Sequence, residues 1–187
     1  GYGRKPSLRA RMADRMLQAH ADGEARVALV RAGDFFGPGV TNALLGERVF
    51  GAAARGKAAQ LLGDIDQPHS YAYVVDFARA LVTVGLDEGA WGGIWHCPHP
   101  PARSTREVVT EIYHRFGREP KLQVLPPWLL QLLALFHPLM RELKEMDYQW
   151  TGPFVVDDSR WRRRYGEGAT DWDTALDATV GWYREHG

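Results

Sequence analysis

The loop at residues 31–39 is the stretch of this sequence best suited to binding a ligand. It reads Arg31-Ala32-Gly33-Asp34-Phe35-Phe36-Gly37-Pro38-Gly39 and follows the apolar run Val27-Ala28-Leu29-Val30. A short apolar run that glycine and proline close is typical of a buried strand that ends in a shaped loop. In open parallel sheets, ligands bind beyond the carboxyl ends of the strands. We therefore expect a binding site at this loop if the strand belongs to such a sheet.

A second group of chemically capable residues is His96-Cys97-Pro98-His99. Imidazole and thiolate are ligands that zinc prefers, but the sequence has no second cluster with matching spacing. The proline also stiffens the run. We therefore predict no metal site, and we interpret the segment as the end of a strand that enters a proline-rich loop.

The charge balance gives no electrostatic basis for binding nucleic acid or an anionic membrane. The 187 residues carry 23 basic and 23 acidic side chains, so the formal net charge is zero. The basic run at residues 160–165 is short, and nearby aspartates balance it. We interpret this run as a turn of surface helix and expect neither nucleic acid nor a membrane among the partners.

The composition is otherwise typical of one globular, cytoplasmic domain. Hydrophobic residues make up 45% of the chain, enough for a sizeable core. The single cysteine, Cys97, excludes an internal disulfide framework and favours a reducing compartment. The longest apolar stretch, residues 128–140, is too short to span a bilayer. The N-terminus has neither an apolar leader nor an initiator methionine, which indicates a processed or truncated polypeptide.

Apolar periodicity and glycine or proline boundaries predict alternating helices and strands. We expect helices at residues 7–22, 76–84, 104–116, 128–146 and 170–185, and strands at residues 27–31, 58–62, 70–74, 92–96 and 121–125. Shorter helical pieces are expected at residues 42–50 and 51–55, with an extended segment at residues 154–157. This alternation indicates an α/β fold.

Several polar residues are expected at the helix starts. Ser7 and Asp76 have the positions of N-caps, and Ser104 with Glu107 forms a capping-box pattern. Only the strands at 27–31 and 93–96 are apolar enough to be fully buried. Because two strands do not make a stable doubly wound sheet, we expect them to be the last strands of a larger sheet whose first strands are absent.

Two segments together resemble the C-terminal half of extended short-chain dehydrogenase/reductases, the NAD-dependent epimerase/dehydratase family. Residues 31–39 are similar to the family pattern R-x-x-x-x-Y-G-P-G, and residues 73–80 are similar to Y-V-x-D-x-A-x-A. The resemblance implies the C-terminal part of a Rossmann-like parallel sheet plus a small, mainly helical substrate lobe. Residues 1–187 would then be a single domain or fragment that lacks the N-terminal dinucleotide-binding half.

The resemblance also implies the catalytic residues. Tyr2-Gly3-Arg4-Lys5 resembles the family's Tyr-x-x-x-Lys motif, with the lysine one position early. In the family the tyrosine is the acid/base and the lysine lowers its pKa and binds the nicotinamide ribose. A phenol with a pKa of about 10 does need a nearby cation to ionise near neutrality. The alternative is that Tyr2 and Lys5 are frayed terminal residues.

The ligand-facing residues follow from the same resemblance. Arg31, Gly33, Asp34 and Phe35 would flank the nicotinamide of the cofactor. Three further residues are candidates for contact with substrate, namely Phe36, His69 and Tyr71, although we favour a core-filling role for Phe36. The arginine that grips the diphosphate in nucleotide-sugar relatives is absent between Gly63 and Asp76. This absence and the apolar segment at residues 126–146 favour an apolar carbonyl substrate over a nucleotide sugar.

The resemblance predicts NAD(P)-dependent chemistry at a carbinol or carbonyl of a small molecule, as reduction, epimerisation or dehydration. NAD or NADP would bind the full-length protein. The chain alone has no G-x-G-x-x-G between a strand and a helix, so we expect it to bind neither. The missing N-terminal half or a second copy would be its partner, with a tendency to self-associate. The alternative function is that of a non-catalytic, stand-alone binding or protein-interaction domain.

Overall fold

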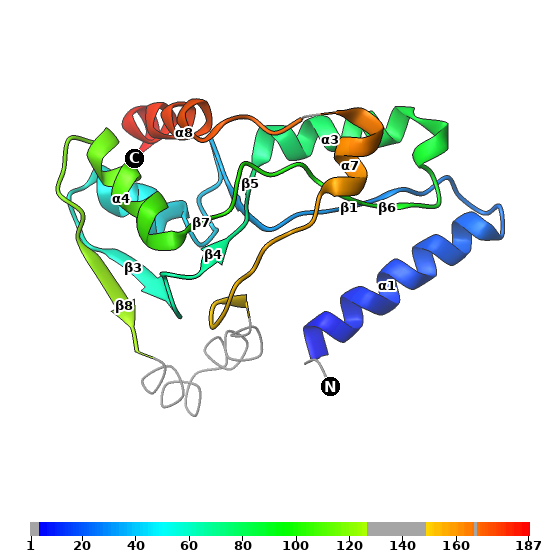
Figure 1. Cartoon of the computed structure of the whole chain (residues 1–187), viewed down its shortest axis with the longest axis horizontal. Coiled ribbons are helices and arrows are strands. Elements are labelled where there is room, and N and C mark those ends of the chain that lie inside the picture. Colours follow the sequence, from blue (N-terminus) through cyan, green and yellow to red (C-terminus); the bar gives the residue numbers. More distant parts are fainter. Residues whose placement is uncertain (1–3, 127–148, 167) are drawn as a thin grey trace.

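The computed structural model describes residues 4–126, 149–166 and 168–187 and shows the α/β fold that the sequence predicts (Figure 1). Within these residues, the strands lie in four two-stranded pairs, of which three are parallel and one is antiparallel. No helix in the described part of the chain is long and apolar enough to cross a membrane. The apolar helix expected at residues 128–146 lies outside the described residues.

The parallel pair of β1 (Leu29–Arg31) and β6 (Ile94–His96) confirms the two predicted strands. The prediction that both are fully buried is wrong for the described part of the chain, because Trp95 is the one buried residue of the pair and neither strand has a further strand beside it. Helices α3 (Val74–Leu86) and α7 (Ser159–Tyr165) lie above this pair in the view of Figure 1, and α1 (Arg4–Ala21) lies below it. A small core of α3, β6 and α7 side chains, including Trp95 and Trp161, covers one side of the pair.

The other strands connect this pair to a second lobe, which contains the helices α2 (Ala52–Ala54), α4 (Thr105–Arg115) and α8 (Trp172–His186). Strand β2 (Asp34–Phe36) pairs in parallel with β5 (Tyr71–Tyr73), and β3 (Ala59–Leu62) pairs in parallel with β8 (Leu122–Leu125). The short antiparallel pair joins β4 (Pro68–His69) to β7 (Arg103–Ser104). The predicted strands at 58–62, 70–74 and 121–125 are therefore confirmed.

The main core lies in the second lobe. It is built by α4, α8, α2, the π-helix η1 (Gly46–Gly51) and the strands beside them. Phe36 is 1% exposed and stacks on Trp172 with ring centroids 5.2 Å apart, so it fills the core as we expected. Large aromatic rings that stack in this way dominate the stabilisation of such a core.

Two predicted helix starts differ from the structure. Ser7 lies inside α1, which already includes Arg4. Asp76 lies in the first turn of α3, whose N-cap is Tyr73. The buried Asp76 carboxylate instead accepts hydrogen bonds of 2.7 Å from both the backbone N–H and the hydroxyl of Thr170. The Asp76 carboxylate, which the local sequence predicts to cap α3, therefore binds the distant residue Thr170 instead.

Other local patterns are confirmed. Ser104 and Glu107 form the complete capping box of α4, and Asp171 caps α8. The short helical pieces predicted at 42–50 and 51–55 appear as η1 and α2, followed by the 3₁₀ turn η2 (Glu88–Ala90) further along the chain. Residue 46, the first of the π-helix, must be glycine because a Cβ there would lie 2.1 Å from the Thr41 carbonyl oxygen.

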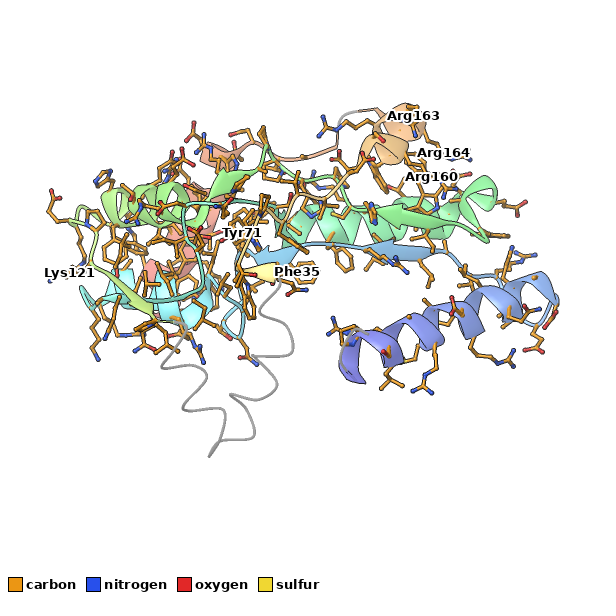
Figure 2. All side chains as sticks on the ribbon, turned by 60° about the horizontal axis from the view of Figure 1, so that its bottom comes forward. Phe35, Tyr71, Lys121, Arg160, Arg163 and Arg164 are labelled. Carbon is orange, nitrogen blue, oxygen red and sulfur yellow. The ribbon has the colours of Figure 1, made fainter. Side chains whose placement is uncertain are left out.

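The basic run at residues 160–165 forms α7, as the sequence predicts, and Figure 2 shows Arg160, Arg163 and Arg164 gathered there. The Arg160 guanidinium lies over the Trp95 ring at 4.1 Å from its centroid. Arg164 donates two hydrogen bonds to the Asp87 carboxylate, at 2.7 and 2.9 Å. Two of these arginines thus hold α7 against the neighbouring elements.

Candidate active site

The loop after β1 is held by two distant segments. The backbone N–H of Gly33 donates to Nε2 of His99 at 2.9 Å. A Cβ at residue 33 would lie 2.4 Å from the carbonyl oxygen of Ser70. Glycine is therefore required here by the close approach of another backbone, and not by a phosphate group.

Asp34, the next residue of the loop, pairs with the imidazole of His69. Nε2 of His69 lies 2.8 Å from Oδ2 of Asp34. The His69 side chain is 5% exposed, whereas that of Asp34 is 29% exposed. The His69 ring lies against the rings of Tyr71 and Phe154, with centroids 4.7 and 5.0 Å away. A ring that packs against two aromatic neighbours and is oriented by a carboxylate can hold a proton at one defined atom.

Tyr71 lies behind this pair and is fully buried. Its hydroxyl is hydrogen-bonded to Oγ1 of Thr105 at 2.7 Å. Burial raises the pKa of the Tyr71 phenol well above its usual value. The phenol therefore stays protonated near neutral pH, and its contact with the site is through the His69 ring.

The remaining loop residue, Phe35, lies on the opposite side of β2 from Asp34. Its ring meets the edge of Phe77 in α3 at a centroid distance of 4.9 Å. Figure 2 shows Phe35 and Tyr71 near one another in the middle of the molecule. Of the residues that the sequence indicated, the structure thus brings together Gly33, Asp34, His69 and Tyr71, whereas the Phe35 side chain packs against α3.

Arg31 lies away from the Asp34–His69 pair and lines a separate hollow beside α1. A hollow of about 450 Å³ separates the end of β1 from α1, and Arg31, Ala32, Pro6 and Arg9 are among its lining residues. The backbone of Lys5 lies in the first turn of α1, next to Pro6. Tyr2 lies outside the described residues. The sheet end and the start of α1 therefore both border this hollow.

His99 is the residue of this site that sequence reasoning missed. We interpreted residues 96–99 as a strand end, which β6 confirms, but the bond from Gly33 to His99 spans 66 residues of sequence. His96 contacts the Asp157 carbonyl through Nδ1 at 2.7 Å, and the Cys97 thiol contacts the Pro98 carbonyl. In the described part of the chain, no group of three or more His, Cys, Asp or Glu side chains could hold a metal ion.

A dinucleotide needs a cradle of backbone N–H groups at a helix N-terminus for its pyrophosphate. In the loop after β1, the N–H of Gly33 already donates to His99. After β2, Pro38 separates Gly37 from Gly39 and has no N–H to offer. Neither of these two positions therefore offers a free N–H to the pyrophosphate of NAD.

Part of this chain is similar to a known protein family. The model of the NAD dependent epimerase/dehydratase family matches residues 7–95, which include β1, the loop and α3. No curated protein matches the sequence significantly. The family resemblance predicted from the sequence is confirmed over the matched residues.

Solved structures confirm the Rossmann-like fold. A dTDP-glucose 4,6-dehydratase from Bacillus anthracis in complex with NAD has a TM-score of 0.72 at 17% identity, over 98% of this chain and 52% of that chain. A UDP-glucuronic acid 4-epimerase from Bacillus cereus in complex with UDP-glucuronic acid and NAD has a TM-score of 0.68 at 13% identity, over 90% and 48%. A Thermus thermophilus UDP-glucose 4-epimerase in complex with NAD has a TM-score of 0.69 at 18% identity, over 94% and 52%. The chain spans about half the length of these proteins.

The Asp34–His69 pair predicts a measurable energetic coupling. A double-mutant cycle with Asp34→Ala and His69→Ala should give a coupling of about 1–2 kcal/mol in the free energy of unfolding, because the hydrogen bond is charge-assisted and mostly shielded from water. Urea unfolding of the four proteins measures it. The exposed Arg15–Glu24 pair is the control and should show almost no coupling. Equal coupling for both pairs would contradict the assignment of Asp34 and His69 as a shielded pair.

Proposed function

We propose that this chain is the C-terminal, substrate-facing part of an NAD(P)-dependent epimerase, dehydratase or reductase that acts on a carbinol or carbonyl. The observation that carries the proposal is the loop at residues 31–36, which leaves the carboxyl end of the parallel strand β1 inside the family-matched segment. Ligands of open parallel sheets bind at this end of the strands. Three of the solved relatives contain NAD, which supports the same cofactor class here.

Tyr2 is the acid/base in this proposal, and Lys5 is the cation that assists it. The hollow beside the start of α1 supports this assignment because it opens between the lysine-bearing turn and Arg31. A bound nicotinamide would supply the hydride chemistry. The residues of this chain would orient the substrate at the loop and exchange a proton at the Tyr2 hydroxyl.

The surroundings of β1 and β6 support a missing partner. Neither strand pairs with another strand among the described residues, although purely parallel sheets are normally extended and covered on both faces. Apolar side chains are exposed on both flanking helices: Leu8, Met12 and Met16 on α1, and Leu81, Val82 and Leu86 on α3. An N-terminal dinucleotide-binding half, or a second copy of the chain, would cover these surfaces and supply the pyrophosphate cradle.

The Asp34–His69 pair supports a substrate without a diphosphate. The relatives' diphosphate-gripping arginine has no counterpart between Gly63 and Asp76, and His69 in this region is already paired with a carboxylate. A partly exposed carboxylate repels an anion and favours a neutral, hydroxyl-bearing ligand. We infer that the substrate is a small, uncharged carbinol or carbonyl compound.

The catalytic assignment predicts the effect of removing one hydroxyl. In the longer protein that carries a dinucleotide-binding half, Tyr2→Phe should lower kcat by about a hundredfold or more, because a positioned proton donor is lost. Lys5→Ala should lower it less. Steady-state kinetics with a small alcohol or ketone measures both effects, and fluorescence titration should show nearly unchanged cofactor affinity for Tyr2→Phe.

Two results would contradict this assignment. Near-full turnover of Tyr2→Phe would mean that the proton comes from another group. Micromolar, one-to-one binding of NAD to the 187-residue chain alone, measured by calorimetry, would mean that this chain carries its own pyrophosphate site.

The uncovered surfaces predict self-association of the isolated chain. Sedimentation equilibrium should show dimers or larger species, and the double change Met12→Glu with Met16→Glu should shift the equilibrium toward monomer, since it places charge on the exposed apolar face of α1. Arg11→Glu is a matched control because it changes the net charge by the same amount. A monomer at all concentrations would contradict an uncovered docking surface.

A further inference from the structure

The imidazole of His99 has a defined protonation pattern in this structure. Its Nε2 accepts the hydrogen bond from the Gly33 N–H, so Nε2 carries no proton. The neutral ring therefore carries its proton on Nδ1, which is buried. The backbone N–H of His99 donates to Oδ2 of Asp158 at 3.2 Å, and the residue is 4% exposed. The ring is thus held in one place and one tautomer.

The position of Gly33 controls the rest of the loop. Residue 33 lies against the Ser70 backbone so closely that a side chain would not fit. Asp34 follows directly and bonds to His69, which precedes Ser70 in the chain. A displacement of Gly33 would therefore also displace the carboxylate that orients His69. The hydrogen bond to His99 holds Gly33, and the pairing of β2 with β5 holds the residues that follow it.

We propose that His99 is a positioning residue, which in its neutral form holds Gly33, the residue before β2, in place and on protonation releases it. A proton on Nε2 turns the acceptor into a donor, so two N–H groups would face each other and the bond to Gly33 would be lost. The loss of this bond follows from the geometry of the two groups, while the residues after Gly33 stay paired with β5. Its consequence for catalysis rests on the proposed function.

The groups that face His99 set the pH at which its imidazole is protonated and the bond to Gly33 is lost. Burial is the largest influence and lowers the pKa of His99 from its ordinary value of 6.5. His96 on β6 acts in the same direction, whereas the carboxylates of Asp158 on the α7 side and Asp76 on α3, together with the Cys97 backbone, act against it. The two carboxylates are themselves neutralised, in part, by ion pairs with arginines one helical turn away.

The sign of the pH effect follows from this lowered pKa. The unfolded chain protonates its histidine near pH 6.5, before the folded chain does. Between the two pKa values the unfolded state binds more protons, so stability falls as the pH falls through this interval. Above pH 6.5 the contribution of His99 is fully present. The bond from Gly33 to His99 is therefore present at neutral pH and is lost in acid.

Nitrogen NMR of the ¹⁵N-labelled 187-residue chain, without cofactor or substrate, tests the proposal. At pH 7.5 we expect a protonated Nδ1, an unprotonated Nε2 and a coupling across the hydrogen bond to the Gly33 nitrogen. On acidification the coupling should vanish together with the titration of His99, at a midpoint below 6.5.

Variants separate positioning from simple burial. His99→Leu keeps the volume but removes the acceptor, so amide exchange at Gly33 should accelerate about tenfold or more, as expected for the loss of one buried hydrogen bond. His99→Gln places an amide oxygen near Nε2 and should restore protection without the pH dependence. His96→Gln is the matched control and should leave the Gly33 amide unchanged.

Three results would overturn the proposal: a proton on Nε2 at pH 7.5, a midpoint at or above 6.5, or unchanged Gly33 exchange in His99→Leu. If His99→Leu does not fold, the tautomer and titration of the unmodified chain still decide. Since no cofactor is present, this outcome is independent of the result for Tyr2→Phe, which tests the proposed function.

Discussion

The parallel pairing of β1 with β6 is the constraint on which the candidate site depends. It aligns Arg31 with His96, so the loops that follow both strands leave the sheet at the same end. The first loop contains Gly33 and the second contains His99, and the hydrogen bond between these residues joins the two loops. The site exists where it does because two parallel strands end together, as in other open parallel sheets.

A second pair of strands carries the site toward the other lobe. Strand β2 aligns Asp34 with Tyr71, and the residue pair Asp34–His69 joins the loop to the segment before β5. At the other end of β2, on the same face as Asp34, Phe36 is packed into the main core against Trp172. The last residue of the short strand β2 therefore anchors it in the core, while its first residue remains partly exposed.

Local sequence patterns predicted much of this fold, because apolar periodicity, glycine boundaries and caps act over a few residues. The strands at 27–31 and 92–96 and the Ser104–Glu107 capping box are examples. The same patterns misassigned Asp76, whose partner Thr170 is 94 residues away. They also identified Gly33, Asp34 and His69 separately but not their contacts, since strand register and loop packing decide which distant residues meet. His99 left no local signal at all, because a histidine beside prolines looks the same whether or not an N–H approaches its ring.

The central claim is that this chain forms one part of a site that another dinucleotide-binding segment completes. The most direct test is the intact mass of the protein, measured by mass spectrometry after isolation from cells that make it from its own gene. The account predicts a single polypeptide well above the 21.0 kDa of these 187 residues, since the solved relatives extend to about twice the matched length. A native polypeptide of 21.0 kDa that binds no dinucleotide-binding subunit would contradict it.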